Sequence, residues 1–94
     1  MRASIVEGGG LGGLVRTVSV DTESDELRSR VESADFFALP SLLGHAAAPD
    51  EPTYAITVDA HTVTVSERAL PAELRALIDW IRSAPGRAER IEPA

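Results

Sequence analysis

The stretch TYAITVDAHTVTVS, residues 53–66, decides the class of fold. It consists of two runs in which apolar and polar side chains alternate, which is typical of strands that bury one face. Only Asp59 and Ala60 separate the runs. This predicts an antiparallel hairpin with a tight turn, or with a longer loop that includes His61, because neither turn residue is glycine. The side chains expected on the buried faces are Tyr54, Ile56, Val58, Val63 and Val65.

A helix is predicted directly after this hairpin, in the segment LPAELRALIDWIRS of residues 70–83. Its apolar residues recur every three or four positions, as on one face of an amphipathic helix, and Pro71 suits the first turn. Trp80 lies beside this stripe, so we expect it to be half-buried, with a role at an interface as the alternative. The stripe consists of Leu70, Leu74, Leu77, Ile78 and Ile81.

The N-terminal part of the chain shows a similar order of strands. RASIVE, residues 2–7, predicts a strand that turns Ala3 and Ile5 inward. LVRTVSVD, residues 14–21, predicts its antiparallel partner across a glycine-rich connection. One face of that partner carries Leu14, Val18 and Val20, interrupted by Arg16.

Another helix is expected between the two pairs of strands. Leu27, Val31 and Ala34 are spaced so that they share one helical face. Ser24 or Thr22 can cap its N-terminus, and the acidic residues of the first turn suit the helix dipole.

These elements predict an α+β fold of order β-β-α-(short α)-β-β-α. Two hairpins would form a four-stranded antiparallel sheet, with the helices packed on one face. The short helical element would begin at Pro40 and end near Gly44, before a loop over residues 45–52. Residues 1–84 are expected to form a single α+β domain. Residues 85–94 show no periodicity, which predicts a flexible C-terminal tail.

The composition narrows the range of functions. The chain has 94 residues and a net charge of −6, and because an acidic surface repels phosphate, no nucleic-acid partner is expected. The absence of cysteine excludes disulfides and thiolate metal sites. The sequence shows no signal-peptide pattern and no apolar run near 18 residues. We therefore expect a cytoplasmic, soluble protein with no membrane partner, monomeric when free.

The glycine cluster EGGGLGGLVR, residues 7–16, has two interpretations. Gly8, Gly10 and Gly13 match the G-x-G-x-x-G spacing, but a strand follows instead of a helix, and the chain has no lysine for a phosphate loop. Cofactor binding is therefore not expected. The cluster is either a flexible connection or a recognition loop, in which glycines let the backbone approach a partner and Leu11 fills a pocket.

No set of residues points to catalysis or to a resident metal. His45 and His61 are the only histidines, and they form neither H-x-x-x-H nor H-E-x-x-H. No serine lies in a G-x-S-x-G elbow, and the carboxylates near residue 24 are explained by helix capping. We therefore expect no enzyme activity, no cofactor and no metal site. His61 is expected to be solvated.

The segment ADFFALP, residues 34–40, contains both phenylalanines of the chain. Neighbouring positions on a helix lie about 100° apart, so Phe36 and Phe37 cannot both face one core stripe. Either the helix ends there and both rings close the open end of the sheet, or one ring stays exposed as a binding anchor.

The order of these motifs resembles the emfourin family. The resemblance rests on the first strand with its glycine-rich turn, followed by ADFFALP, YAITVDAHTVTV and LPAELRALIDWI, and it spans about residues 2 to 83. It implies a small proteinaceous inhibitor of thermolysin-like (M4) metallopeptidases such as protealysin. Those enzymes hold a catalytic zinc in a cleft and prefer a bulky apolar side chain just after the scissile bond. The alternative is a protein-binding or regulatory module that inhibits no peptidase.

The glycine content of the first loop, its isolated leucine and its position between two strands suggest that this loop meets the peptidase. The loop of residues 8–14 would enter the cleft, with Leu11 in the apolar pocket and Glu7 or a loop carbonyl near the metal. A second candidate surface comprises residues 36–43 with the loop that follows. The predicted partner-binding residues are Glu7, Gly9, Gly10, Leu11, Gly12, Phe36, Phe37 and Leu39.

Overall fold

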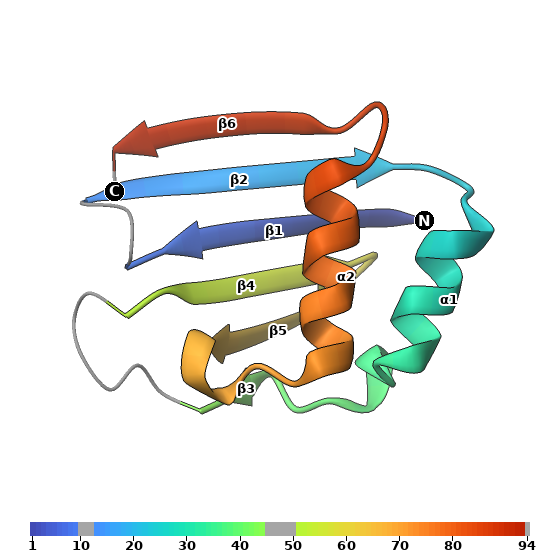
Figure 1. The fold of residues 1–94 in the computed structure, drawn as a ribbon, viewed down its shortest axis with the longest axis horizontal. Helices are drawn as coiled ribbons and strands as arrows, with labels where there is room; N and C mark the ends of the chain where they lie inside the picture. Colours follow the sequence, from blue (N-terminus) through green and yellow to red (C-terminus); the bar gives the residue numbers. More distant parts are fainter. Residues whose placement is uncertain (10–12, 45–50, 94) are drawn as a thin grey trace.

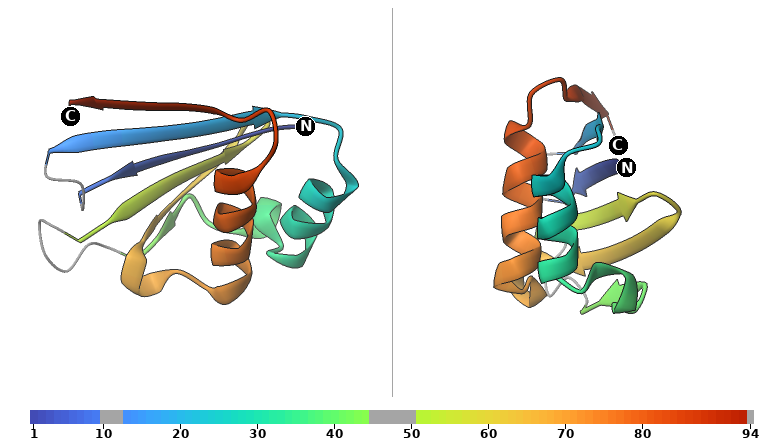
Figure 2. Two further views of the ribbon diagram at one scale, coloured as in Figure 1. Left: turned by 45° about the horizontal axis from the view of Figure 1, so that its top comes forward. Right: turned by 90° about the vertical axis from the view of Figure 1, so that its right-hand side faces the viewer.

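The computed structural model describes residues 1–9, 13–44 and 51–93, which fold into two layers. A six-stranded mixed sheet, in the order β3-β5-β4-β1-β2-β6, carries both α-helices on one face (Figures 1 and 2). The elements are β1 (Arg2–Gly8), β2 (Leu14–Asp21), α1 (Asp25–Ser33), η1 (Phe36–Ala38), β3 (Leu42–Leu43), β4 (Thr53–Val58), β5 (His61–Ser66), η2 (Glu67–Ala69), α2 (Ala72–Ser83) and β6 (Ala88–Pro93).

The two predicted hairpins form the centre of the sheet. β1 pairs with β2, and β4 with β5, all antiparallel, and β4 also pairs with β1. Val58 lies opposite His61, which confirms the tight turn of Asp59 and Ala60. The Asp59 amide donates to the Arg2 carbonyl at 2.8 Å, and the Arg2 amide donates to Asp59 Oδ1 at 3.1 Å. These bonds join the turn of one hairpin to the first strand of the other.

Both predicted helices are present, and their apolar stripes lie on the sheet. Ser24 caps α1, since its hydroxyl accepts a hydrogen bond from the Leu27 amide at 3.3 Å. α2 begins directly after Pro71, and Trp80 packs half-buried at the edge of the core, as expected. The core combines the predicted inward positions of the strands with both helix stripes: Ala3, Ile5, Val18, Val20, Leu27, Val31, Tyr54, Ile56, Val58, Val63, Val65, Leu74, Leu77, Ile78 and Ile81.

The sheet has more strands than predicted, and it is mixed instead of purely antiparallel. The short helical turn predicted after Pro40 is wrong, because the chain there forms β3, which pairs parallel with β5. Where the sequence predicted a tail without regular structure, Ala88–Pro93 forms β6, antiparallel to β2. All six β6 residues are exposed, so this strand forms through backbone pairing and leaves no apolar alternation to detect.

Among the residues described, no helix is long and apolar enough to span a membrane.

Candidate functional site

The ends of β1 and β2 border the predicted recognition loop. Gly10, Leu11 and Gly12 lie outside the described residues, but Gly9 and Gly13 on either side have φ of 84° and 85°. Residues other than glycine rarely adopt this backbone conformation. A β-carbon on Gly9 would also collide with the carbonyl oxygen of Glu51, whereas one on Gly13 would meet nothing within 4 Å. The backbone at Gly9, directly after β1, therefore lies against the segment that leads into β4.

Glu7 lies one residue before this connection, but it points into the molecule. Its strand alternates with Ala3 and Ile5 buried, so Glu7 faces the helices and is itself buried. It forms an ion pair with Arg82 of α2, which is partly buried. A buried carboxylate needs such a partner, since an isolated charge removed from water is strongly unfavourable. The end of β1 is thus tied to the last turn of α2.

Arg82 connects this ion pair to a second polar group. Its guanidinium lies 5.4 Å from the centre of the Tyr54 ring, which faces the same side of the sheet as its cross-strand neighbour Glu7. The Tyr54 hydroxyl donates to Glu67 Oε2 at 2.5 Å, and Arg75 of α2 also pairs with Glu67.

These contacts shift two ionisation equilibria in the group. Burial, and then the hydrogen bond to Glu67, raise the pKa of Tyr54 to about 12. The hydrogen bonds from Tyr54 and then from Arg75 lower the pKa of Glu67, because both favour the carboxylate. The phenol therefore stays neutral and the carboxylate stays charged across the physiological range.

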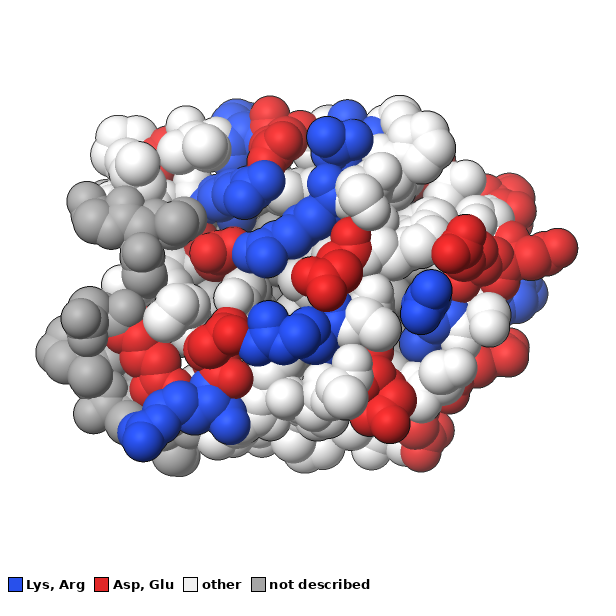
Figure 3. Space-filling view, viewed as in Figure 1, with Lys and Arg blue, Asp and Glu red and all other residues white. Residues whose placement is uncertain are grey.

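Tyr54, Glu7 and Arg16 lie opposite one another on neighbouring strands and form a polar row that continues toward β6. Arg16 lies opposite Glu7 in the sheet, and its Nε donates to Glu89 of β6 at 2.6 Å. Arginine and carboxylate side chains are interleaved over the helix-bearing face (Figure 3). The apolar core ends at this polar row. Further along the same face, β2 has only the exposed Leu14, and β1 ends in glycine.

The two phenylalanines have different environments. Phe36 is fully buried, whereas Phe37 is 53% exposed. The helix does end before them, as predicted, but the expectation that both rings close the sheet is wrong. The reason is that Asp35 adopts a left-handed conformation with φ of 49°, after which η1 turns only the first ring inward. The exposed Phe37 fits the alternative interpretation of a surface anchor.

His61 packs beside these rings instead of being solvated. Its ring centre lies 5.4 Å from that of Phe36 in an edge-to-face arrangement, and 6.0 Å from that of Phe37. Its Nε2 lies 3.2 Å from the Leu39 carbonyl oxygen. Leu39 itself is partly buried against the core.

The structure therefore separates the predicted partner-binding residues into two groups. Gly8 pairs with Thr53, while at the far end of the same ladder Ala3 pairs with Val58, the neighbour of His61. Five residues of strand span about 16 Å. Glu7 and Gly9 thus lie at one end of the sheet, and the Phe36–Phe37–His61 cluster lies near the other, beside α1 (Figure 1).

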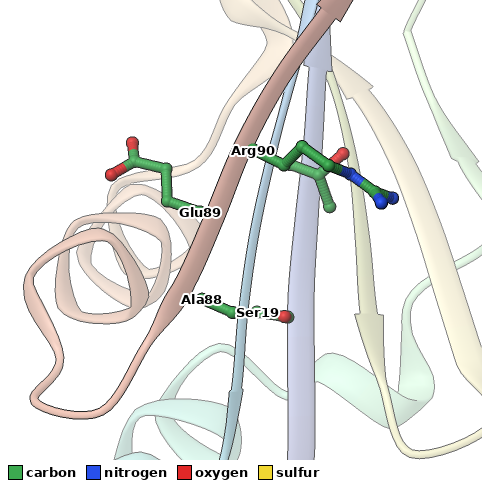
Figure 4. A pocket seen from close by; sticks show the side chains of 5 residues that line it. Ser19, Ala88, Glu89 and Arg90 are labelled. Atoms are coloured by element: carbon green, nitrogen blue, oxygen red, sulfur yellow. The ribbon is translucent and has the colours of Figure 1, made fainter.

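The described part of the surface has shallow hollows. One open hollow of about 330 Å³ lies between β2 and β6, lined by Thr17, Ser19, Ala88, Glu89 and Arg90. Glu89 and Arg90 leave β6 on opposite sides (Figure 4). In the part of the chain that the structure describes, no three histidine or carboxylate side chains are placed to hold a metal ion.

Sequence reasoning missed the residues that hold the strand ends. Arg82 pairs with a residue 75 positions away, and neither it nor Tyr54 belongs to a local motif. The available signal was Glu7 itself, which occupies an inward position of its strand together with Ala3 and Ile5. A charged side chain at such a position requires a partner. Arg16, which interrupts the apolar face of the next strand, is a second signal of the same kind.

Comparison with known proteins gives one match. The family model described as Emfourin matches residues 5–82, a segment that extends from within β1 to within the last turn of α2 and leaves β6 outside. No curated protein matches the chain. No solved structure matches it either.

Proposed function

The chain belongs to the Emfourin family, and from that premise we propose that it inhibits M4 metallopeptidases by inserting the β1–β2 connection into their active-site cleft. The family is known for inhibitors of protealysin and other M4 metallopeptidases, and it is a family of protease inhibitors and not of enzymes. The observation that carries the mechanism is the bracing of this connection at both of its ends.

Bracing matters because an inhibitor must occupy the cleft without being cleaved. A loop held in one conformation loses little conformational entropy on binding and resists the rearrangement that cleavage requires. The strands on either side of the connection, β1 and β2, pair with each other and with β4 and β6. The Glu7–Arg82 ion pair ties the end of β1 to α2, and the backbone at Gly9 lies close to the Glu51 carbonyl.

Within this proposal, the residues have different roles. Leu11 fills the apolar pocket that M4 peptidases use for the residue after the scissile bond, and Gly10 and Gly12 allow close approach of the backbones. A carbonyl of the loop lies near the zinc ion of the peptidase. We assign Glu7 to bracing, because its carboxylate is buried and already paired with Arg82.

The surface near Phe37 and Leu39 is the competing candidate. Phe36 does not belong to it, since it is fully buried and is needed by the core. Phe37 remains available as an exposed ring, but it lies near the opposite end of the sheet from Gly9. Because the two candidates lie at opposite ends of the sheet, a substitution in one leaves the other unchanged, and the two can be tested separately.

Inhibition titrations distinguish the candidates. Purified protein is titrated against thermolysin and further M4 peptidases, with residual activity plotted against molar ratio. The proposal predicts loss of activity at about one inhibitor per enzyme, loss of inhibition in Leu11→Asp, and retention in Phe37→Ser. Both variants must keep the far-ultraviolet circular dichroism of the wild type. If Leu11→Asp inhibits normally, the loop assignment is wrong.

A further inference from the structure

The helix-facing side of the sheet carries apolar side chains that no helix covers. Leu14 at the start of β2 is 43% exposed, and Ile91 of β6 is 58% exposed. Leu14 lies opposite Pro93, and Arg16 opposite Ile91. Cross-strand partners project from the same face of a sheet, so these side chains share the face on which Val18 is buried. Ile91 ends the polar row opposite Arg16, and Leu14 and Pro93 lie just beyond it, so the three side chains form an apolar patch at this corner of the sheet.

The position of this patch ties it to the loop. Leu14 directly follows Gly13, the last glycine of the connection, so the patch begins where the connection ends. A stable protein–protein interface buries about 800 Å² per partner, which a short loop cannot supply. Surface next to the loop must therefore also meet the peptidase. Among the described residues on the helix-facing side, Leu14 and Ile91 are the large apolar side chains exposed at this end of the sheet.

We propose that Leu14, Ile91 and Pro93 form a secondary docking surface that contacts apolar residues on the rim of the peptidase cleft. This inference rests on the proposed function, since it assumes that the β1–β2 connection enters that cleft. The Arg16–Glu89 ion pair borders the patch on its core side. An apolar centre with a polar border is the usual composition of a protein–protein interface.

The surface determines which peptidases are bound tightly. Two of its three residues come from β6, which lies outside the segment matched by the family model. The part of the chain inside that segment contributes the braced connection, and β6 adds contacts that depend on the rim of a particular peptidase. Rim residues differ between enzymes that share one catalytic cleft, because surface loops vary more than the scaffold that carries them.

The test compares inhibition constants of single variants on one M4 peptidase that the wild type inhibits. Leu14→Ser and Ile91→Ser are each expected to raise the inhibition constant about tenfold, as for a buried apolar side chain at an interface. Leu42→Ser is the matched control, since this leucine is 49% exposed on β3, the opposite edge strand. Val6→Ser is the control for the opposite face of β1. Both controls are expected to change the constant less than about twofold.

The outcomes separate this inference from the proposed function. If Leu14→Ser and Ile91→Ser inhibit like the wild type, the docking surface is wrong while the inhibitor function stands. The docking surface is also wrong if Val6→Ser raises the inhibition constant more than Leu14→Ser or Ile91→Ser does, because the peptidase then meets the other face of the sheet. If the wild type inhibits no M4 peptidase, the proposed function fails and this inference fails with it. Ile91 is exposed on an edge strand, so Ile91→Ser serves even if Leu14→Ser does not fold.

Discussion

The two ends of the central sheet each contain a segment predicted to bind a partner, but they differ in structure. Near one end, two adjacent phenylalanines lie beside His61, and one of them is fully buried. At the other end, β1 and β2 lead into Gly9 and Gly13, which have positive φ. A buried ion pair there holds Glu7, the last residue before the glycine cluster. The first region stabilises the fold through packing. In the second, the Glu7–Arg82 ion pair ties the end of β1 to α2.

The comparison teaches that apolar character alone does not identify a contact residue. Phe36 and Phe37 are adjacent and chemically identical, and only the backbone turn at Asp35 decides which one is core. At the loop end, in contrast, the informative residues are the glycines and one inward-facing carboxylate.

The largest effect is expected within the phenylalanine pair. Phe36→Ala removes a fully buried ring and should lower the free energy of unfolding by about 3–5 kcal/mol, whereas Phe37→Ala should lower it by less than about 1 kcal/mol. Urea denaturation followed by circular dichroism measures both values. Equal losses would mean that the two rings have the same structural role, contrary to this comparison.

The glycines at the loop end should form a graded series. Gly9→Ala requires a left-handed alanine whose β-carbon meets the Glu51 carbonyl, so we expect a loss of about 2–3 kcal/mol. Gly13→Ala has the same φ but open space, and should cost about 1 kcal/mol. Gly8→Ala, which has neither constraint, is the control and should change stability by less than about 0.5 kcal/mol. The same denaturation experiment ranks the three variants. If Gly9→Ala is as stable as Gly8→Ala, the close approach of Gly9 to the Glu51 carbonyl is wrong.

The polar group beside Glu7 predicts a specific response to alkaline pH. The pKa of Tyr54 is raised from 10.0 to about 12, so the unfolded chain loses this proton at lower pH than the folded protein. The contribution of this group to the free energy of unfolding is fully present below pH 10. It declines as the pH rises toward 12, and about 1 kcal/mol of it is lost at pH 11.

Two features of the chain allow the titration of Tyr54 to be separated from that of other groups. It contains one tyrosine and no lysine, and the amino group of Met1, whose pKa is also raised, contributes equally in Tyr54→Phe. The difference in unfolding free energy between wild type and Tyr54→Phe should therefore shrink from pH 9 to pH 11. A constant difference over this range would show that the phenol is not held neutral by its surroundings.

The smallest effect concerns the ion pair that reaches β6. Both side chains of the Arg16–Glu89 pair are about one-third exposed, so Glu89→Gln should cost less than about 1 kcal/mol. Glu26→Gln, which breaks the Glu26–Arg30 pair on the surface of α1, is the control and should cost about 0.3 kcal/mol. A loss above about 3 kcal/mol in Glu89→Gln would mean that β6 depends on this side-chain contact more than on backbone pairing.

Much of the fold could be predicted because the buried residues repeat with the period of their element. The central hairpins and α2 have such patterns, and their predicted inward residues are buried, except Leu14, which is exposed at the start of β2, and Leu70, which is partly buried. β6 could not be predicted, since none of its side chains is buried and backbone pairing leaves no mark on residue type. β3 comprises only Leu42 and Leu43, which is too short to show alternation.

The candidate site was predictable only in part, for a related reason. Glycines reveal the loop locally, because backbone conformation is a local property. The Glu7–Arg82 pair depends on two residues that approach only after β1 and α2 have packed together. Sequence spacing cannot indicate such a pair, although the inward carboxylate shows that a partner must exist.

Amide hydrogen exchange on the complex with an inhibited M4 peptidase shows which end of the sheet meets the enzyme. Exchange of each segment is compared between the free and the bound protein. We predict strong slowing across residues 8–14 on binding, and no change across residues 36–43. Slowing confined to residues 36–43, with residues 8–14 unaffected, would contradict the assignment of the glycine-flanked end of the sheet as the inhibitory end.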